Sequence, residues 1–299
     1  MTFDRMLGRV SAGDNLTADE ITELAAARDI LSLGTLADAT RRRLHGTRVT
    51  YVRVATCAFD RSFANAVPPD AGEVRITGAP DTLDAAVAAT EGAKAAAGDR
   101  TVSGFSWADM ERLASKEGVP LSQALAHLRA AGLDALAEIP LDAVPDMAVA
   151  ADSLGRAGFQ QLRLTVEHAP AGERTALWLH AAALQQLCGG VHTINPLPTV
   201  MSALRPTTGY DDVKAVAMAR LAAPNIASIQ VDWLRYGPKL AQVALTFGAD
   251  DLDGVSASDE APDGRRRAPL EEVRRSIEAA GFSPAERDGR FNLLQISEK

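Results

Sequence analysis

The chain has 299 residues, of which 46% are hydrophobic and 23% are charged, and its formal net charge is −8 with a pI of about 5.2. This is the composition of a globular protein that can bury a large core, and its acidic balance argues against a nucleic-acid partner. Two cysteines cannot make a disulfide framework, and the sequence shows neither a signal-peptide core nor an apolar run of membrane length. We therefore expect a soluble cytoplasmic protein with no membrane partner.

A helix is predicted to begin after Thr17. Thr17 and Glu20 have the spacing of a capping box, in which each side chain binds the free backbone N–H of the other residue. The arginines at 41–43 suit the negative end of the helix dipole, and Gly46 ends the helix. We expect one break in it, near Gly34.

Strands and helices then alternate along the chain. The predicted strands cover 49–55, 73–77, 101–104, 133–139, 159–166, 191–195, 225–231 and 250–255. The predicted helices cover 81–97, 106–131 with a division at 118–120, 140–157, 173–188, 210–222 and 238–247. A helix on each crossover makes the strands parallel, and eight such units close a TIM-type (β/α)8 barrel of the α/β class. An open doubly wound sheet is the alternative, but no glycine-rich dinucleotide fingerprint follows the first strand.

The end of the chain departs from this alternation. A polar loop is predicted over 256–267, followed by a helix over 269–281 with acidic residues in its first turn. Residues 282–290 either form a hairpin or pack on the barrel. The chain is thus divided into an N-terminal helical segment at 1–48, the barrel at 49–255, and a C-terminal loop and helix at 256–299 that pack on the barrel.

Five stretches of the sequence, taken together, resemble one known family. They read RRRLHG at 41–46, RPTTGYDD at 205–212, DWLRYGPKLAQVAL at 232–245, FGADDLDG at 247–254 and AAGFSPAERD at 279–288. In this order and spacing the chain resembles aminofutalosine synthase and dehypoxanthine futalosine cyclase, which are radical-SAM enzymes of menaquinone biosynthesis, and their deazaflavin-forming relatives. The resemblance implies a radical-SAM barrel.

The cluster motif of that family is incomplete in this sequence. The family carries C-x3-C-x2-C followed by Ala-Phe, and the three thiolates hold a four-iron, four-sulfur cluster that binds SAM. Cys57 matches the last position and precedes the Ala-Phe pair, but Thr50 and Val54 stand at the other two. The paired glycines expected near SAM are reduced to Gly78. We therefore expect neither the cluster nor SAM, and Cys57 is interpreted as a vestigial cluster position.

Candidate site residues follow from barrel geometry, because working residues lie at the carboxyl ends of the strands. The catalytic candidates are Glu138, His168 and Asp253, and the ligand-binding candidates are Asn195, Arg205, Asp232, Asp250 and Asp251. The resemblance implies that His168 matches a family histidine and that the aspartates of FGADDLDG lie by the substrate. Each candidate also has a structural interpretation as a cap, an ion-pair partner or an exposed loop residue. No metal is expected, because a set made of His168, His192, Glu138 and Asp253 has no supporting local spacing.

Three functions stay open at this point. The favoured one is a non-catalytic partner or carrier for an active radical-SAM homologue, with a homodimer as the other assembly, because the C-terminal stretches persist while the cluster motif is lost. The alternative is a cluster-independent enzyme that acts on a futalosine-like nucleoside in the barrel mouth. The third is a ligand-binding or structural protein outside that pathway.

Overall fold

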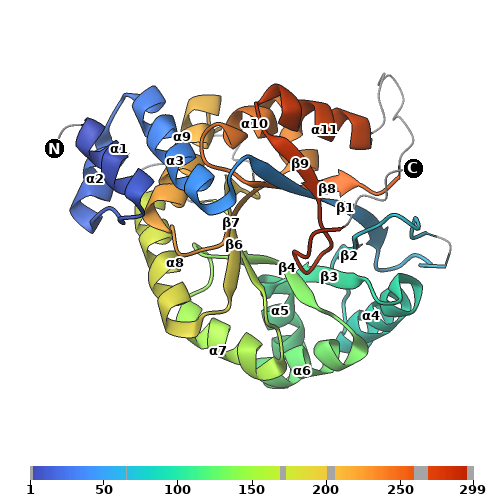
Figure 1. Cartoon of the computed structure of the whole chain (residues 1–299). Helices are drawn as coiled ribbons and strands as arrows, with labels where there is room; N and C mark the ends of the chain where they lie inside the picture. The colour runs from blue at the N-terminus through green and yellow to red at the C-terminus, as the bar shows by residue number, and fades with distance from the viewer. Residues whose placement is uncertain (1–2, 65, 169–172, 201–205, 259–268, 295–299) are drawn as a thin grey trace.

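Parallel strands form a closed barrel in the computed structural model, which describes residues 3–64, 66–168, 173–200, 206–258 and 269–294. Strand β1 closes the barrel, because it pairs in parallel with both β2 and β8. The barrel strands are β1 (Arg48–Ala58), β2 (Glu73–Thr77), β3 (Thr101–Ser106), β4 (Ala135–Pro140), β5 (Leu162–Val166), β6 (Val191–Pro198), β7 (Ser228–Asp232) and β8 (Asp251–Ser256). The predicted (β/α)8 barrel is confirmed, and the open doubly wound sheet is wrong (Figure 1).

Helices surround the barrel in the order that the alternation predicts (Figure 1). They are α4 (Leu83–Ala97), α5 (Trp107–Glu117), α6 (Leu121–Ala131), α7 (Met147–Ala157), α8 (Arg174–Cys188), α9 (Gly209–Ala222) and α10 (Trp233–Leu245). Two predicted starts are wrong. Helix α7 begins at Met147 rather than 140, since the Asp146 side chain caps it there. Helix α10 begins at Trp233 rather than 238, since Asp232 caps it and the kink at Gly237, with φ of 77°, interrupts it without ending it.

Three helices precede the barrel: α1 (Phe3–Ala12), α2 (Ala18–Ala26) and α3 (Ile30–His45). The capping box of α2 is confirmed, because Thr17 Oγ1 accepts from the Glu20 N–H and Glu20 Oε2 accepts from the Thr17 N–H. The predicted break near Gly34 is wrong, and the chain breaks before Asp29, which caps α3. Gly34 instead allows α3 to approach Phe247, whose ring would lie 2.8 Å from any Cβ at that position.

The end of the chain returns to the first strand. Helix α11 (Pro269–Ala279) packs against α10, β8 and β9, and the short strand β9 (Ser283–Glu286) pairs in parallel with the amino half of β1. The following residues turn into the amino end of the barrel, where Arg287 and Leu293 form an antiparallel bridge (Figure 1). We call residues 287–293 the C-terminal plug. A hairpin and packing on the barrel, offered above as alternatives, therefore occur together.

The interior of the barrel is unusually polar. TIM-barrel interiors are mostly filled by branched aliphatic side chains. Here Glu73 and Asp251 have no exposed surface, and Arg163 is 4% exposed. Each of these charges has an ion-pair partner, so the centre of the barrel is held by paired charges as well as by apolar packing. Along the described residues, no helix is both long and apolar enough to cross a membrane.

Candidate ligand site in the barrel mouth

A cavity of about 620 Å³ opens at the carboxyl end of the barrel. This is the end at which β/α barrels bind their ligands, and the volume falls within the range of small-molecule pockets. Four of the predicted site residues line it: Glu138 on β4, Asn195 on β6, Asp232 at the end of β7 and Asp253 on β8. Apolar surface comes from Ile76, Phe105, Leu164 and Leu234. The cavity can therefore take a ligand with both polar and flat apolar groups.

The predicted residue His168 does not contribute to this cavity. The His168 side chain is 57% exposed and lies outside the cavity lining, with its Nδ1 atom 3.3 Å from Glu167 Oε1. The backbone N–H groups of both residues donate to the carboxylate of Asp142, at 2.7 Å each, so this turn is held by a local cap. Arg205 lies outside the described residues.

The prediction that Asp250 and Asp251 lie at the carboxyl end of a strand is wrong. Strand β8 begins at Asp251, so both carboxylates lie at the amino end of the barrel, away from the cavity. Asp250 pairs with the fully buried Arg220 and accepts from the Ile229 N–H at 2.8 Å. Asp251 pairs with Arg287 of the C-terminal plug. Both residues hold elements together.

Three arginines complete the site and were not among the predicted residues. Arg75 Nη2 donates to Asp253 Oδ1 at 2.9 Å and to Glu73 Oε1 at 2.7 Å. Arg163 lines the cavity from β5, and Arg235 Nη2 donates to Glu138 Oε1 at 2.9 Å on the rim. A sequence signal existed for two of them: Arg163 is the single charge inside the apolar strand LRLTV, and Arg75 stands two residues after Glu73 in EVRIT, where both side chains point to the same face of the strand.

Asp232 and Asp253 bring two carboxylates close together in the mouth. The pKa of Asp232 is raised, first by burial and then by the negative charge of Asp253. The Arg235 N–H, which donates to Asp232 Oδ1 at 2.9 Å, and the Arg75 guanidinium oppose this rise. Arg75 contacts Asp253 directly, so the two carboxylates have different environments. Such asymmetry suits a pair in which one member carries a proton and the other a charge.

The residues at the cluster positions do not fit a four-iron, four-sulfur cluster. Thr50, Val54 and Cys57 all lie on β1, and seven residues of extended strand span about 23 Å, too far for three ligands of one cluster. Thr50 Oγ1 is used at the other end of the barrel, where it donates to Asp251 Oδ2 at 2.5 Å. Thr56 lines the cavity, so the neighbouring Cys57 faces the opposite side of the strand, into the apolar core. Burial raises the pKa of the Cys57 thiol, which disfavours the thiolate that binds iron.

The proposed histidine and carboxylate metal set does not meet in space. His192 lies near the amino end of the barrel, where its ring contacts Phe291 of the C-terminal plug with 4.0 Å between centroids. Glu138 and Asp253 lie at the mouth, and His168 lies outside it. Across the described ranges, no cluster of three or more histidine, cysteine, aspartate or glutamate side chains has a geometry that could hold a metal ion.

Comparison with known families gives a match to the last third of the chain. Residues 195–299 match the family described as the CofH/MqnC C-terminal region. The 5-amino-6-(D-ribitylamino)uracil–L-tyrosine 4-hydroxyphenyl transferase of Archaeoglobus fulgidus is 38% identical over 37% of this chain and 36% of its own length. The aminodeoxyfutalosine synthase of Thermus thermophilus is 24% identical over 97% of this chain and 95% of its own length. This chain matches only about a third of the length of the Archaeoglobus fulgidus transferase and of two further transferases of the same name.

Solved structures share the barrel at low sequence identity. The FeFe-hydrogenase maturase HydG of Carboxydothermus hydrogenoformans superposes with a TM-score of 0.68 at 13% identity, covering 95% of this chain and 79% of HydG. Methylornithine synthase (PylB) superposes with a TM-score of 0.65 at 13% identity, covering 94% of this chain and 97% of PylB. At this identity the likeness shows the barrel fold alone. In sequence, the chain resembles the radical-SAM family of the futalosine pathway.

Proposed function

We propose that this protein is a radical-SAM-like barrel of the futalosine pathway that works without an iron–sulfur cluster or SAM, as a non-catalytic partner or carrier for an active homologue. The observation that carries the proposal is a contrast within one barrel. The mouth keeps a polar cavity with Glu138, Asn195, Asp232 and Asp253 on its wall. The cluster positions, in contrast, are spread along β1, and the remaining thiol faces the core.

The cavity chemistry favours a neutral or cationic heterocycle that carries hydroxyl groups. Its arginines are already paired: Arg75 with Asp253 and Glu73, Arg163 with Glu73, and Arg235 with Glu138. Paired guanidinium groups offer little net attraction for a phosphate or carboxylate, whereas Asp232 and the amide of Asn195 offer polar contacts. The curated relatives are named for a ribitylaminouracil and for aminodeoxyfutalosine. A nucleoside-like ligand of the futalosine type meets these requirements.

A second candidate function is supported by the carboxylate pair. Asp232, with its raised pKa, keeps its proton to higher pH than an ordinary aspartate, and Asp253 lies beside it against Arg75. Such a pair can serve as general acid and general base. On this alternative the protein is a cluster-independent enzyme that acts on a futalosine-like nucleoside in the same cavity.

Binding is tested by thermal shift with purified protein and three probes: SAM, aminofutalosine and dehypoxanthine futalosine. A ligand that binds only the folded state at 100 times its Kd adds about 2.7 kcal/mol to the free energy of unfolding, which is readily measured. We expect a shift with a futalosine compound and none with SAM. The shift should be reduced in Asn195→Ala and retained in Asp152→Asn, a control whose side chain is 56% exposed on α7.

The outcomes separate the candidates. A shift with SAM would contradict the loss of its site, and no shift with either nucleoside would remove ligand binding from the proposal. Turnover of a bound nucleoside that is abolished by Asp232→Asn or Asp253→Asn would favour the enzyme. Binding without turnover, together with an active radical-SAM homologue that co-purifies from the native host, would favour the partner or carrier.

A further inference from the structure

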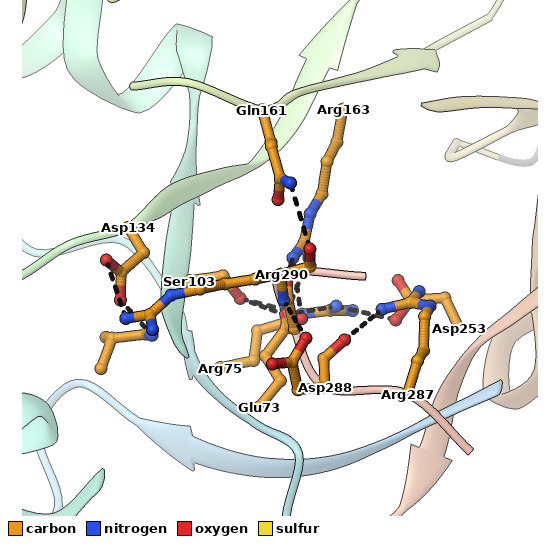
Figure 2. Close-up of polar contacts among 12 residues, drawn as sticks. Glu73, Arg75, Ser103, Asp134, Gln161, Arg163, Asp253, Arg287, Asp288 and Arg290 are labelled. Atoms are coloured by element: carbon orange, nitrogen blue, oxygen red, sulfur yellow. Dashed lines mark hydrogen bonds and ion pairs between the residues drawn. The ribbon is translucent and has the colours of Figure 1, made fainter. Parts of the chain in front are cut away.

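A chain of ion pairs runs through the barrel from the mouth to the C-terminal plug (Figure 2). At the mouth, Arg75 Nη2 lies 2.9 Å from Asp253 Oδ1 and 2.7 Å from Glu73 Oε1. Glu73 also accepts from Arg163 Nη1 at 2.9 Å and from Ser103 Oγ at 2.6 Å. Glu73 is thus shared by two arginines that both line the cavity, and one of them, Arg163, also contacts the C-terminal plug.

Arg163 is also bound by the C-terminal plug. Arg163 Nη2 donates to the backbone carbonyl of Gly289 at 2.7 Å, and the same nitrogen lies 2.9 Å from Glu73 Oε2 (Figure 2). The plug is fixed beside this contact, because Gly289 N–H donates to the Gly72 carbonyl at 3.0 Å and Gln161 Nε2 donates to the Arg290 carbonyl at 3.1 Å. One guanidinium group therefore contacts both the plug and the carboxylate beneath the mouth.

The fit of the plug leaves no spare room. A Cβ atom at Gly289 would lie 2.6 Å from Thr101 Cβ and 3.0 Å from Glu73 Oε2. Thr101 and Glu73 are both buried at the starts of their strands. Any side chain at position 289 must therefore push the plug outward or displace Glu73. A displacement of Glu73 acts on Arg75, because the two groups are directly paired.

Burial makes these contacts mutually dependent. Glu73 has no exposed surface, and the guanidinium groups of Arg163 and Arg75 hold its pKa well below the usual range despite burial, which alone would raise it. A buried carboxylate that loses one arginine draws more closely on the other, since water is not at hand to replace the lost partner. Loss of the Arg163 contact is therefore expected to pull Arg75 toward Glu73 and away from Asp253.

We infer that Arg163 is a positioning residue for the mouth: it is fixed by the Gly289 carbonyl of the plug and, through Glu73 and Arg75, it fixes the carboxylate pair at the cavity. This inference extends the proposed function, because it names what sets the geometry of the proposed ligand site. It gives the C-terminal plug a role in ligand binding at the opposite end of the barrel.

The test measures the titration of Asp232 in the barrel mouth, with no ligand present. The carboxyl carbon of Asp232 is followed by NMR as a function of pH in protein labelled at aspartate, with Asp232→Asn used to assign its signal. The charged groups facing Asp232 are Asp253, Arg75 and Arg235, the last of which is paired with Glu138. Since Arg75 opposes the rise in the pKa of Asp232, its withdrawal should raise that pKa further.

The variants are Arg163→Lys and Gly289→Ala, with Gly155→Ala as the matched control. Gly155 lies on α7 with nothing within 4 Å of an added Cβ, so the control adds the same methyl group without a clash. We expect the Asp232 titration to move to higher pH in Gly289→Ala, to move less in Arg163→Lys, which keeps a positive charge beside Glu73, and to stay in place in Gly155→Ala. The Asp232 titration should move further to high pH in Arg163→Met than in Arg163→Lys, because methionine carries no charge.

The result that would overturn the inference is a lowered melting temperature in Gly289→Ala and Arg163→Lys with an unchanged Asp232 titration, because the plug would then serve stability alone. Thermal shift with dehypoxanthine futalosine on the same variants is the second measurement. If the wild type binds no probe, the proposed function fails while the titration still decides the positioning role. If the wild type binds, the plug variants should weaken binding and Gly155→Ala should not.

Discussion

At the scale of single residues, Asp232 controls the charge of the mouth. Its pKa is raised above the ordinary value of 3.8 by burial and then by Asp253, so the folded state holds this proton more tightly than the unfolded chain. Its contribution to the free energy of unfolding is therefore greatest below the ordinary value and is lost as pH rises through the raised pKa. Asp232→Asn removes that loss. We expect the free energy of unfolding of the variant, relative to wild type, to increase as the pH rises above 3.8 in urea denaturation. A difference that does not change with pH would contradict this.

Gly254 leaves the space that the Asp232 carboxylate occupies. Gly254 has φ of 70°, and a Cβ there would lie 2.9 Å from Asp232 Oδ1. Gly254→Ala is expected to lose about 1–2 kcal/mol of stability from backbone strain alone. It should also displace the Asp232 carboxylate, so nucleoside binding should weaken in the thermal-shift assay. Gly155→Ala, which meets no atom within 4 Å, is the control for added volume. Equal stability of the two variants would show that the mouth tolerates the methyl group.

The sequence predicts the mouth residues of four strands correctly, and its predictions are wrong where the exact strand limits matter. Glu138, Asn195, Asp232 and Asp253 were recovered because barrel strands point their ends at the cavity. The motif FGADDLDG was interpreted as one patch, yet it runs from before the start of β8 into the strand, so Asp250 and Asp251 lie at the amino end while Asp253 lies at the mouth. The strand patterns indicate that Arg75 and Arg163 are buried, but their partners on other strands, Asp253 and Glu73, follow only from the closed barrel.

At the scale of elements, Asp250 joins α3, α9 and β8. It pairs with Arg220 of α9, and His45 Nε2 of α3 lies 3.5 Å from its Oδ2. Asp250→Asn leaves the fully buried Arg220 without its charge partner, and we expect a loss of about 3–5 kcal/mol in urea denaturation. The control is Asp152→Asn, whose partner Arg156 is 78% exposed and whose loss should cost less than about 1 kcal/mol. Similar losses in the two variants would show that Arg220 finds another partner.

The sequence patterns predict which elements exist better than they predict where each element begins and ends. The alternation of β-branched and alanine-rich segments was enough for every barrel strand, although limits moved by several residues, as for β6, which extends to Pro198. Helix α1 lies within the predicted helical segment at 1–48 but was not predicted as a separate helix, because Gly8 interrupts its short apolar pattern. Strand β9 was not predicted either, since SPAE has a proline and no apolar alternation, and only its ladder with β1 makes it a strand.

At the scale of the whole molecule, β9 completes the amino end of the barrel. Glu286 accepts from Arg53 Nε at 2.6 Å and from the Tyr51 hydroxyl at 3.1 Å, all three side chains being buried. A chain that stops at Phe282 would leave Arg53 and Tyr51 without this partner and Asp251 without Arg287. We expect its urea midpoint to fall sharply relative to a chain that stops at Leu294, which keeps β9 and the plug. Equal midpoints would show that the barrel closes without its last strand.

The pairing of β9 with β1 also bears on how the chain folds during synthesis. Arg48 and Ser283 are register partners although they lie more than two hundred residues apart in the sequence. Contacts of such long range slow folding, because the chain between them must be ordered first. The amino half of β1 is synthesised early, but its partner strand β9 is synthesised only near the end of the chain. A chain whose synthesis ends before residue 283 has no β9, so the amino half of β1 keeps an exposed strand edge, which chaperones can bind and which otherwise favours aggregation.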